Sequence, residues 1–443
     1  MFNHAKVVLG VLLSFIMVSQ SYAVGGSFIS NEVLSARSAG QGYVGVAGQN
    51  NDPMAVYTNP AAMTALKGTQ VTVGGTLENI HGSYQDNAGV ESKERVTNVG
   101  VPNLAATQNF MDGKLAVGLS VQSPFGLETH WDANSPMGAV ATNSRIGMTD
   151  VTPAVAYQIH PMVSVGAGAD YVNLFNAQLD RQISVDGVDF LLGNPTLGAG
   201  QAVSSLRGES TNWGYHAGVV IKPTEQHAIG ITYHSKIDLR VNGNVSVSGI
   251  SPTSPMAQLF GTSNFTTSAY TDLVLPENIQ MGYAFKPNDK WLFEADAAWF
   301  HWSSAQDLNV RYPAINPNTV VGATQLALLN SGNPEMLNPR EAWSAAAGAN
   351  YKVTDRIQVR SGFWYEPSAL PDANFSPAFM DMTRYGLSFG AGYGILENLT
   401  VDAAYTAVFM HNRTINNGLA PSGTYSDFAN LFALNFTYRF GRS

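Results

Sequence analysis

Residues 428–440 read FANLFALNFTYRF, and this alternating stretch decides the fold class. Successive side chains of a β-strand point to opposite faces. One parity carries the large apolar residues Phe428, Phe432, Leu434, Phe436, Tyr438 and Phe440. The other parity, most of it small or polar, carries Ala429, Leu431, Ala433, Asn435, Thr437 and Arg439. The stretch therefore predicts a strand with one lipid-like face, as in a transmembrane barrel.

Two further segments, 343–351 and 356–365, alternate in the same way. A soluble antiparallel sheet alternates as well, so the number and the connections of such segments decide between the two. We expect fourteen strands, near residues 69–84, 95–109, 114–130, 144–159, 162–185, 210–222, 227–245, 266–286, 290–310, 340–352, 355–366, 383–395, 398–412 and 424–440.

The connections between these strands alternate in length. Short turns rich in Pro, Gly, Asn and Asp alternate with long connections at 186–209, 246–265, 311–339, 367–382 and 413–423. Short turns at one end and long loops at the other are typical of an outer-membrane barrel. An even strand number places both termini on the periplasmic side. A soluble secreted sandwich, the alternative, gives no reason for this alternation.

The composition also favours a membrane protein. The chain has 443 residues and a formal net charge of −9, yet only 12% of its residues are charged, against about 25% in soluble proteins. The hydrophobic content of 45% excludes a disordered chain. The lack of excess basic residues excludes a nucleic-acid binder. Because the chain has no Cys, disulfide scaffolds and thiolate zinc sites are excluded too.

The first 23 residues predict export. His4 and Lys6 precede the apolar run VVLGVLLSFIMV at 7–18, which is too short for a transmembrane helix. Small residues at Ser21 and Ala23 suit a signal peptidase, so we expect a signal peptide at 1–23. An interfacial anchor helix is the alternative. No later stretch of about 18 apolar residues predicts a transmembrane helix, which leaves a closed barrel as the membrane-spanning structure.

Residues 24–68 precede the first strand and are rich in Gly, Ala, Asn and Ser. Eight strands already enclose an interior just filled by side chains, so a fourteen-stranded barrel has room for this segment. We expect it to form a plug inside the barrel, and 69–443 to form the barrel itself. The segment contains a GxGxxG pattern at 40–45. A dinucleotide-binding loop needs a preceding strand and an acidic residue about 20 positions later, so glycines that allow close backbone packing are the better interpretation.

The N-terminal segment resembles a known family. Residues 35–45 (SARSAGQGYVG) and 51–61 (NDPMAVYTNPA) look like the N-terminal hatch of the FadL family of outer-membrane transporters, whose hallmark is the triplet Asn59, Pro60 and Ala61. The resemblance continues in order along the mature chain, through 101–103, 123–127, Trp131, 152–157, 164–168, 275–276, 299–303, 340–343, 360–365, 376–377 and 381–394.

The resemblance implies a 14-stranded barrel plugged by a hatch, and uptake of hydrophobic molecules across the outer membrane of a Gram-negative bacterium. Long-chain fatty acids are the expected substrate, with aromatic hydrocarbons and a diffusion porin for small polar solutes as alternatives. We expect contacts with outer-membrane lipids and lipopolysaccharide, a monomer, no nucleic acid, no cofactor, no metal and no enzymatic activity. GxSxG and HExxH are absent, and the nine His are scattered. One departure is the C-terminal Gly441-Arg442-Ser443 after Phe440.

In this family the third and fourth long loops capture the substrate, the hatch gates an apolar pocket, and the substrate leaves sideways through a gap in the third strand. The apolar loop residues here include 190–192, Met256, 259–260, Leu326 and 328–329, and packing of the loops on each other is the alternative. The corresponding gap is Ser123, Pro124, Phe125 and Gly126, where Pro cannot donate a ladder hydrogen bond. A routine bulge is the alternative there.

A fatty acid carboxylate buried in an apolar lumen requires a cationic partner. Arg340 opens the tenth expected strand on the parity opposite to Trp343, so it is expected to face the lumen. It also matches a basic position that contacts the ligand in relatives. Arg181 matches the second such position, but its parity points outward unless a one-residue bulge intervenes. Rim arginines paired with loop acids are the alternative for both.

Overall fold

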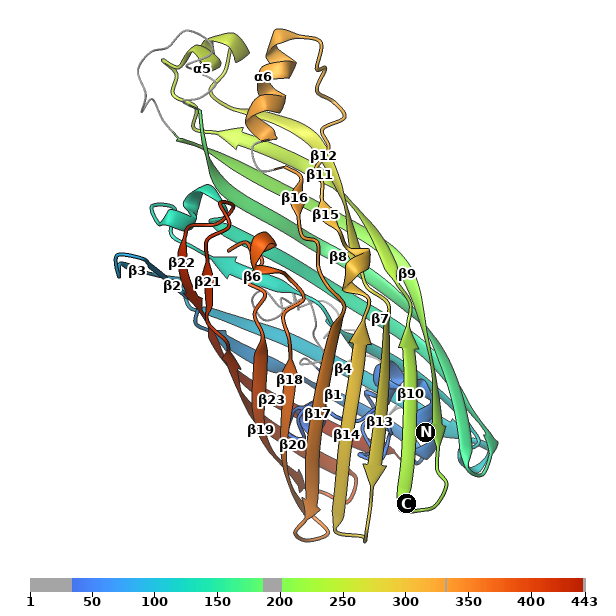
Figure 1. Cartoon of the computed structure of the whole chain (residues 1–443). Coiled ribbons are helices and arrows are strands. Elements are labelled where there is room, and N and C mark those ends of the chain that lie inside the picture. Colours follow the sequence, from blue (N-terminus) through green and yellow to red (C-terminus); the bar gives the residue numbers. More distant parts are fainter. Residues whose placement is uncertain (1–33, 186–200, 331–332, 441–443) are drawn as a thin grey trace.

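The computed structural model describes residues 34–185, 201–330 and 333–440, and these form a closed antiparallel barrel (Figure 1). The expected signal peptide, residues 24–33 and the C-terminal 441–443 lie outside the described residues. Strand β1 (Thr69–Ile80) pairs on one side with β4 (Thr97–Phe110) and on the other with the last strand, β23 (Phe428–Phe440). The sheet therefore closes on itself and has no free edge strand.

In this part of the chain the wall has fourteen strands, which confirms the expected number. Three wall strands consist of two segments each, because the chain leaves the ladder briefly and then resumes it. In order the wall is β1, β4, β5 (Leu115–Gln122) with β6 (Leu127–His130), β7 (Asn143–His160), β8 (Val163–Ser184), β9 (Gln201–Ile221), β10 (His227–His234) with β11 (Ile237–Ser248), β12 (Phe265–Leu275) with β13 (Asn278–Phe285), β14 (Trp291–Phe300), β17 (Ala342–Lys352), β18 (Ile357–Glu366), β19 (Arg384–Gly394), β20 (Leu399–Met410) and β23.

The short turns lie at the lower end of the barrel in Figure 1 and the long loops at the upper end. The loops contain a four-stranded sheet of β2 (Ser83–Asp86), β3 (Glu91–Lys93), β21 (Arg413–Ile415) and β22 (Gly423–Ser426). Their other elements are η3 (Pro136–Ala139), α5 (Pro255–Phe260), η4 (Trp302–Ser304), the pair β15 (Asp307–Leu308) and β16 (Glu335–Met336), α6 (Val320–Leu329) and η5 (Asp372–Asn374); η2 (Met111–Gly113) forms one of the turns.

Several expected boundaries are wrong. The strand expected at 210–222 begins at Gln201, so the loop expected at 186–209 is shorter. The strands expected at 227–245 and 266–286 are each interrupted, the second at Pro276, which cannot donate to a ladder. The strand expected at 290–310 ends at Phe300.

Exposure confirms the lipid-like face. In β23, Phe432 and Leu434 are 49% and 46% exposed, whereas Leu431 and Ala433 on the other parity are 1% and 5% exposed. The same alternation recurs along β18, where Val359 is exposed and its neighbours on the other face are covered. The large apolar side chains thus surround the barrel on its outer face, where a bilayer would cover them. Within the described residues, no helix has the length and apolar character needed to cross a membrane.

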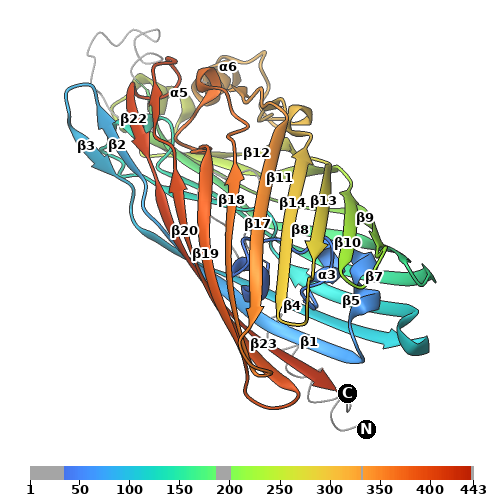
Figure 2. The same ribbon diagram turned by 60° about the horizontal axis from the view of Figure 1, so that its bottom comes forward.

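Residues 34–68 lie inside the barrel, as the sequence predicts for this part of the plug (Figure 2). They contain α2 (Ala36–Ala39), α3 (Ala55–Thr58) and the 3₁₀ helix η1 (Pro60–Ala65). We call residues 34–68 the hatch. Its apolar side chains pack on small residues of the inner wall, among them Ala105, Ala116, Ala154 and Ala156. The hatch and the wall therefore share one hydrophobic cluster.

Candidate functional site

The main candidate binding site is a mostly apolar cavity of about 330 Å³ between the barrel wall and the extracellular loops. This volume is within the range of small-molecule pockets. Aliphatic side chains from six wall strands and from the β15–β16 loop form most of its lining, including Leu127, Ile146, Leu179, Leu206, Val241, Val245, Leu273, Leu308 and Val310. We call it the upper cavity.

Arg181 is part of the lining of the upper cavity. It reaches this face because β8 contains a one-residue bulge: Leu174 pairs with Ser210, but Ala177 pairs with Gly208. A bulge inserts one residue and reverses the parity of the residues that follow. The sequence places Arg181 toward the lumen only if such a bulge precedes it, and the structure contains this bulge. Arg181 donates a hydrogen bond from Nη2 to the carbonyl oxygen of Leu329 at 3.3 Å.

The charge of Arg181 is little compensated. Among the described residues, no carboxylate forms an ion pair with it within 4.0 Å. The nearest acidic neighbour in the cavity is Glu335 of β16, and burial raises the pKa of that carboxyl group above its usual value. A second arginine of the lining, Arg145, forms an ion pair with Glu128. Of the two arginines in the described lining, Arg181 is thus the one without an ion-pair partner.

Arg340 lies outside the strand that was expected to orient it toward the lumen, so its role as a ligand anchor stays a prediction. Strand β17 begins at Ala342, so Arg340 precedes the wall ladder. Its backbone N–H donates to the carbonyl oxygen of Ala369 in the next long loop, and its side chain is exposed. The alternation within β17 holds, since Trp343 is exposed and Ala342 is buried. The parity argument fails for Arg340 because parity places a side chain only within a continuous strand.

A smaller apolar cavity of about 30 Å³ continues the upper cavity toward the interrupted third wall strand. The two cavities share Leu127, Ile146, Leu273 and Phe379. Phe125 and Gly126 line the smaller one. The ring of Phe125 meets that of Trp302 edge to face, with centroids 6.4 Å apart. The two cavities are therefore neighbours, and the smaller one reaches the wall at Phe125.

The expected interruption of the third strand is confirmed at Ser123, Pro124, Phe125 and Gly126, which separate β5 from β6. The interruption leaves part of the neighbouring strand β4 without a ladder partner on this side. The β4–β5 ladder ends at the pair Leu104 and Val121, and β6 pairs with β7.

In the described residues, no ladder pair joins 97–103 of β4 to the third wall strand. The chains meet again above this segment, where the N–H of Arg95 donates to the carbonyl oxygen of His130 at 2.9 Å. The wall thus has a window in its backbone pairing, bounded by hydrogen bonds above and below.

Asn59 connects the hatch internally and to the wall. Its Nδ2 donates to the carbonyl oxygen of Val46 at 2.8 Å and to that of Val219 in β9 at 3.3 Å, and its Oδ1 accepts from the N–H of Ala61 at 3.2 Å. Asn59, Pro60 and Ala61 are all buried. The triplet therefore ends α3, begins η1 and fixes both against the wall.

Inward-facing glycines let the hatch backbone approach the wall. A Cβ atom at Gly166 would lie 2.6 Å from Ala61 N, and one at Gly218 would lie 2.1 Å from Asn59 Oδ1. The same is true elsewhere around the wall, at Gly118, Gly230, Gly282, Gly348, Gly362 and Gly390. We call these eight residues the glycine seats. The GxGxxG stretch meets three of them, at Gly348, Gly362 and Gly390, which confirms close packing as its interpretation.

Charged side chains of the wall also bind the hatch. Arg37 donates to Asp402 of β20 at 2.7 Å, and Arg360 of β18 donates to the other oxygen of Asp402 at 2.7 Å. Asp296 of β14 accepts from the backbone N–H groups of Gly45 and Val46 at 2.8 and 3.1 Å. The hatch is thus held by ionic as well as apolar contacts.

The apolar loop residues pack on each other, which was the alternative to an exposed capture surface. Met256 of α5 and Leu328 and Leu329 of α6 are buried in one cluster with Ile183 and Val247. Residues 190–192 lie outside the described residues. The loops therefore form a cover of the upper cavity with its own hydrophobic core.

Sequence reasoning did not find Arg145, Glu335 or the glycine seats. The glycines are numerous, 43 in the chain, but the ones that face inward can be identified only from the register. For Arg181 a signal exists in the sequence: the parity of the aliphatic residues changes from Val172 and Leu174 to Leu179 and Ile183, as a one-residue bulge requires.

Comparison with known proteins agrees with this architecture. Residues 16–440 match the family model described as outer membrane protein transport protein (OMPP1/FadL/TodX). A 47 kDa outer membrane protein of Pasteurella multocida is 27% identical, with 97% of this chain and 98% of that protein covered. The long-chain fatty acid transport protein of Salmonella typhi is 25% identical, with 96% of each chain covered.

Solved structures show the same fold. A Pseudomonas aeruginosa FadL homologue superimposes with a TM-score of 0.80 at 22% identity, over 93% of this chain and 100% of that chain. The Ralstonia pickettii toluene transporter TbuX gives a TM-score of 0.66 at 18% identity, over 92% and 98% of the two chains. Together with the family match over residues 16–440, the closed fourteen-stranded barrel identifies this chain as a member of the FadL/TodX family of Gram-negative outer-membrane proteins that transport hydrophobic compounds.

Proposed function

We propose that this protein takes up long-chain fatty acids. The observation that carries the proposal is Arg181, a cation with no ion-pair partner among the described residues, in the wall of a mostly apolar cavity. A fatty acid has one carboxylate and a long apolar chain, and it matches both features. Charge-assisted hydrogen bonds to a guanidinium are strong in such surroundings. The similarity to proteins named long-chain fatty acid transport protein supports the same substrate.

The proposed route begins at the loop cover and continues through the upper cavity. The chain of the fatty acid would extend from Arg181 along Leu179 and Leu273 into the smaller cavity at Phe125. Movement of Phe125 away from Trp302 would then open the path toward the window between β4 and the third wall strand. Lateral release into the bilayer suits an apolar molecule, because it avoids transfer into water.

The hatch is proposed to control this route. It fills the barrel below the cavities and is held by Asn59, by the pair Arg37–Asp402 and by the glycine seats. Its presence in the lumen argues against a diffusion porin for small polar solutes, which needs an open aqueous path. Movement of the hatch would have to break these contacts, so we expect small displacements in place of complete removal.

Uptake of aromatic hydrocarbons is the second candidate, and the apolar lining of the upper cavity is what favours it. A neutral hydrocarbon makes no use of Arg181. The test is mass spectrometry of small molecules extracted from protein purified without added lipid, followed by competition binding with a fatty acid and with toluene. A bound fatty acid displaced only by fatty acids supports the proposal. Displacement by toluene alone would assign the protein to hydrocarbon uptake.

A further inference from the structure

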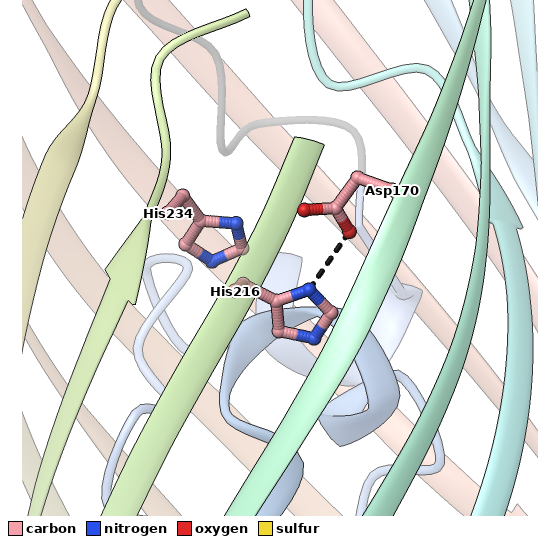
Figure 3. Close-up of side chains that lie close together, drawn as sticks. All are labelled: Asp170, His216 and His234. Carbon is pink, nitrogen blue, oxygen red and sulfur yellow. Dashed lines mark hydrogen bonds and ion pairs between the residues drawn. The ribbon is translucent and has the colours of Figure 1, made fainter. Parts of the chain in front are cut away.

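A second group of polar side chains lies at the contact between the hatch and the wall, away from both cavities. Asp170 of β8, His216 of β9 and His234 of β10 come from three consecutive wall strands and are buried (Figure 3). His216 and His234 are direct partners in the β9–β10 ladder, so their side chains share the inner face as neighbours. One possible ligand atom from each of the three residues lies within 4.8 Å of the others.

The hydrogen bonds of His216 define its tautomer. Its Nε2 lies 2.9 Å from the carbonyl oxygen of Val56 in α3. A carbonyl oxygen only accepts, so Nε2 carries the proton. The other nitrogen, Nδ1, lies 2.8 Å from Oδ1 of Asp170. In a neutral ring this places a lone pair against a carboxylate oxygen, so the contact needs a positive charge, either a second proton on the ring or a metal ion between the two atoms.

The surroundings add negative charge without a fixed counter-charge. Thr152 donates toward Asp150 at 3.1 Å and toward Asp170 at 3.3 Å, so two buried carboxylates lie next to each other. In the described part of the chain, neither forms an ion pair with Lys or Arg. Buried carboxylates are costly unless a cation compensates them. The compensating positive charge at this site must therefore come from protons on these groups or from a bound ion.

His234 is the third potential ligand. It packs on Tyr57 of α3, with ring centroids 4.8 Å apart, and its Nε2 is buried and has no hydrogen-bond partner among the described residues. Figure 3 shows a nitrogen of its ring facing the carboxylate that His216 also contacts. The centroids of the two imidazole rings lie 5.0 Å apart, with their planes 12° from parallel.

We propose that Asp170, His216 and His234 bind a divalent first-row transition-metal ion. Two imidazoles and one carboxylate are a donor set that suits Zn²⁺, Co²⁺ or Ni²⁺. Metal-bound imidazoles characteristically donate their second N–H to a backbone carbonyl or carboxylate, as His216 does to Val56. Ligand bonds to zinc are about 2.0–2.2 Å long, so the 2.8 Å separation of Nδ1 and Oδ1 would widen only slightly around the ion.

A metal ion here would connect the hatch to the wall. His216 holds Val56 of the hatch, and fixing its ring by coordination would fix that contact as well. His234 is the last residue of β10, where the wall ladder is interrupted before β11, so it has freedom to adjust to the ion. The inference does not depend on which hydrophobic molecule the protein transports.

The test uses the full-length protein in detergent, with Co²⁺ as the probe because its visible absorption reports coordination geometry. We expect one Co²⁺ per chain, displaced by Zn²⁺, and protection of the hatch against limited proteolysis in proportion to occupancy. His234→Phe keeps a ring against Tyr57 but removes a ligand, and should lower the affinity at least about tenfold. His227→Phe is the matched control, because His227 lies on the opposite, outer face of the same strand. This variant should bind Co²⁺ as the native protein does.

Asp170→Asn is a second variant in case His234→Phe fails to assemble, and it should weaken binding similarly. Assembly of each variant is checked by the shift of gel mobility on boiling. Absence of stoichiometric Co²⁺ binding to the native protein would overturn the proposal. Equal Co²⁺ affinity in an assembled ligand variant and in His227→Phe would do the same, since the ion would then bind elsewhere.

Discussion

Arg37 of the hatch and Asp402 of the wall form an ion pair at 2.7 Å in which both side chains are almost completely buried. The second oxygen of Asp402 accepts from Arg360, so one wall carboxylate compensates two buried guanidinium groups. Removing one member of a buried ion pair leaves an uncompensated charge, which costs about 3–5 kcal/mol.

Asp402→Asn is therefore expected to release the hatch from this side of the wall while the barrel, held by its ladders, stays assembled. Limited proteolysis of residues 34–68, compared with the gel shift on boiling, measures the two effects separately. Asp355→Asn, which removes an exposed turn pair with Lys352, is the control and should change neither, because surface pairs contribute about 0–1 kcal/mol. An equally protected hatch in Asp402→Asn would show that the apolar contacts suffice.

The glycine seats provide the second prediction. In Gly348→Ala the new Cβ would lie 2.0 Å from the carbonyl oxygen of Gln41, so the hatch backbone must move. Overpacking of this kind costs about 1–3 kcal/mol, and we expect faster proteolysis of the hatch and altered uptake. Gly100→Ala is the control, since nothing lies within 4 Å of a Cβ there. Identical hatch protection in the two variants would contradict a seating role.

Sequence reasoning predicted the barrel well because alternation is a local signal that the wall repeats fourteen times. Phe432 and Leu431 differ in exposure as their parity requires. The strand expected to begin at residue 340 begins at Ala342, because the continuation of a strand beyond its last ladder pair depends on tertiary contacts such as that of Arg340 with Ala369. The cluster around His216 combines residues 46 and 18 positions apart and depends on register, which composition and local pattern do not fix.

The third prediction concerns the window at the third wall strand. Pro124→Val with Gly126→Val restores an N–H donor and favours extended backbone. The chain between β5 and β6 can then pair with residues 97–103 of β4, which have no ladder partner in the third wall strand. We expect slower uptake of fatty acid by cells, with unchanged binding at the cell surface. Pro223→Val in a short turn is the control. Native uptake rates in the assembled double variant would rule out release at this window.

The fourth prediction concerns the pH dependence of the extracellular loop sheet. Burial raises the pKa of Asp427 to about 7, and burial followed by repulsion from Asp427 raises the pKa of Glu94 well above its usual value. A carboxyl group with a raised pKa favours the folded state below its ordinary pKa of about 4. That stability is lost as the pH rises toward 7.

We therefore expect the loop sheet to be less protected in hydrogen exchange at pH 8 than at pH 5. Asp427→Asn should flatten this dependence by removing the charge. Glu91→Gln, an exposed change in the same sheet, should leave it in place. A pH dependence that is the same in native protein and in Asp427→Asn would assign it to other groups.

The last prediction separates the two arginines that the sequence proposes as ligand anchors. Arg181 lies in the upper cavity and donates to Leu329, whereas Arg340 is exposed and outside the lining of the described cavities. Loss of a hydrogen bond to a charged group costs about 1.5–3 kcal/mol, which corresponds to a roughly 10- to 100-fold weaker affinity. Arg181→Ala is expected to weaken fatty acid binding by this factor and to leave binding of the fatty alcohol of equal length nearly unchanged. Arg340→Ala should have a much smaller effect on both ligands. Calorimetric titration of both ligands into both variants measures the four affinities, and equal losses for acid and alcohol in Arg181→Ala would show that Arg181 supports the cavity wall and does not recognise the carboxylate.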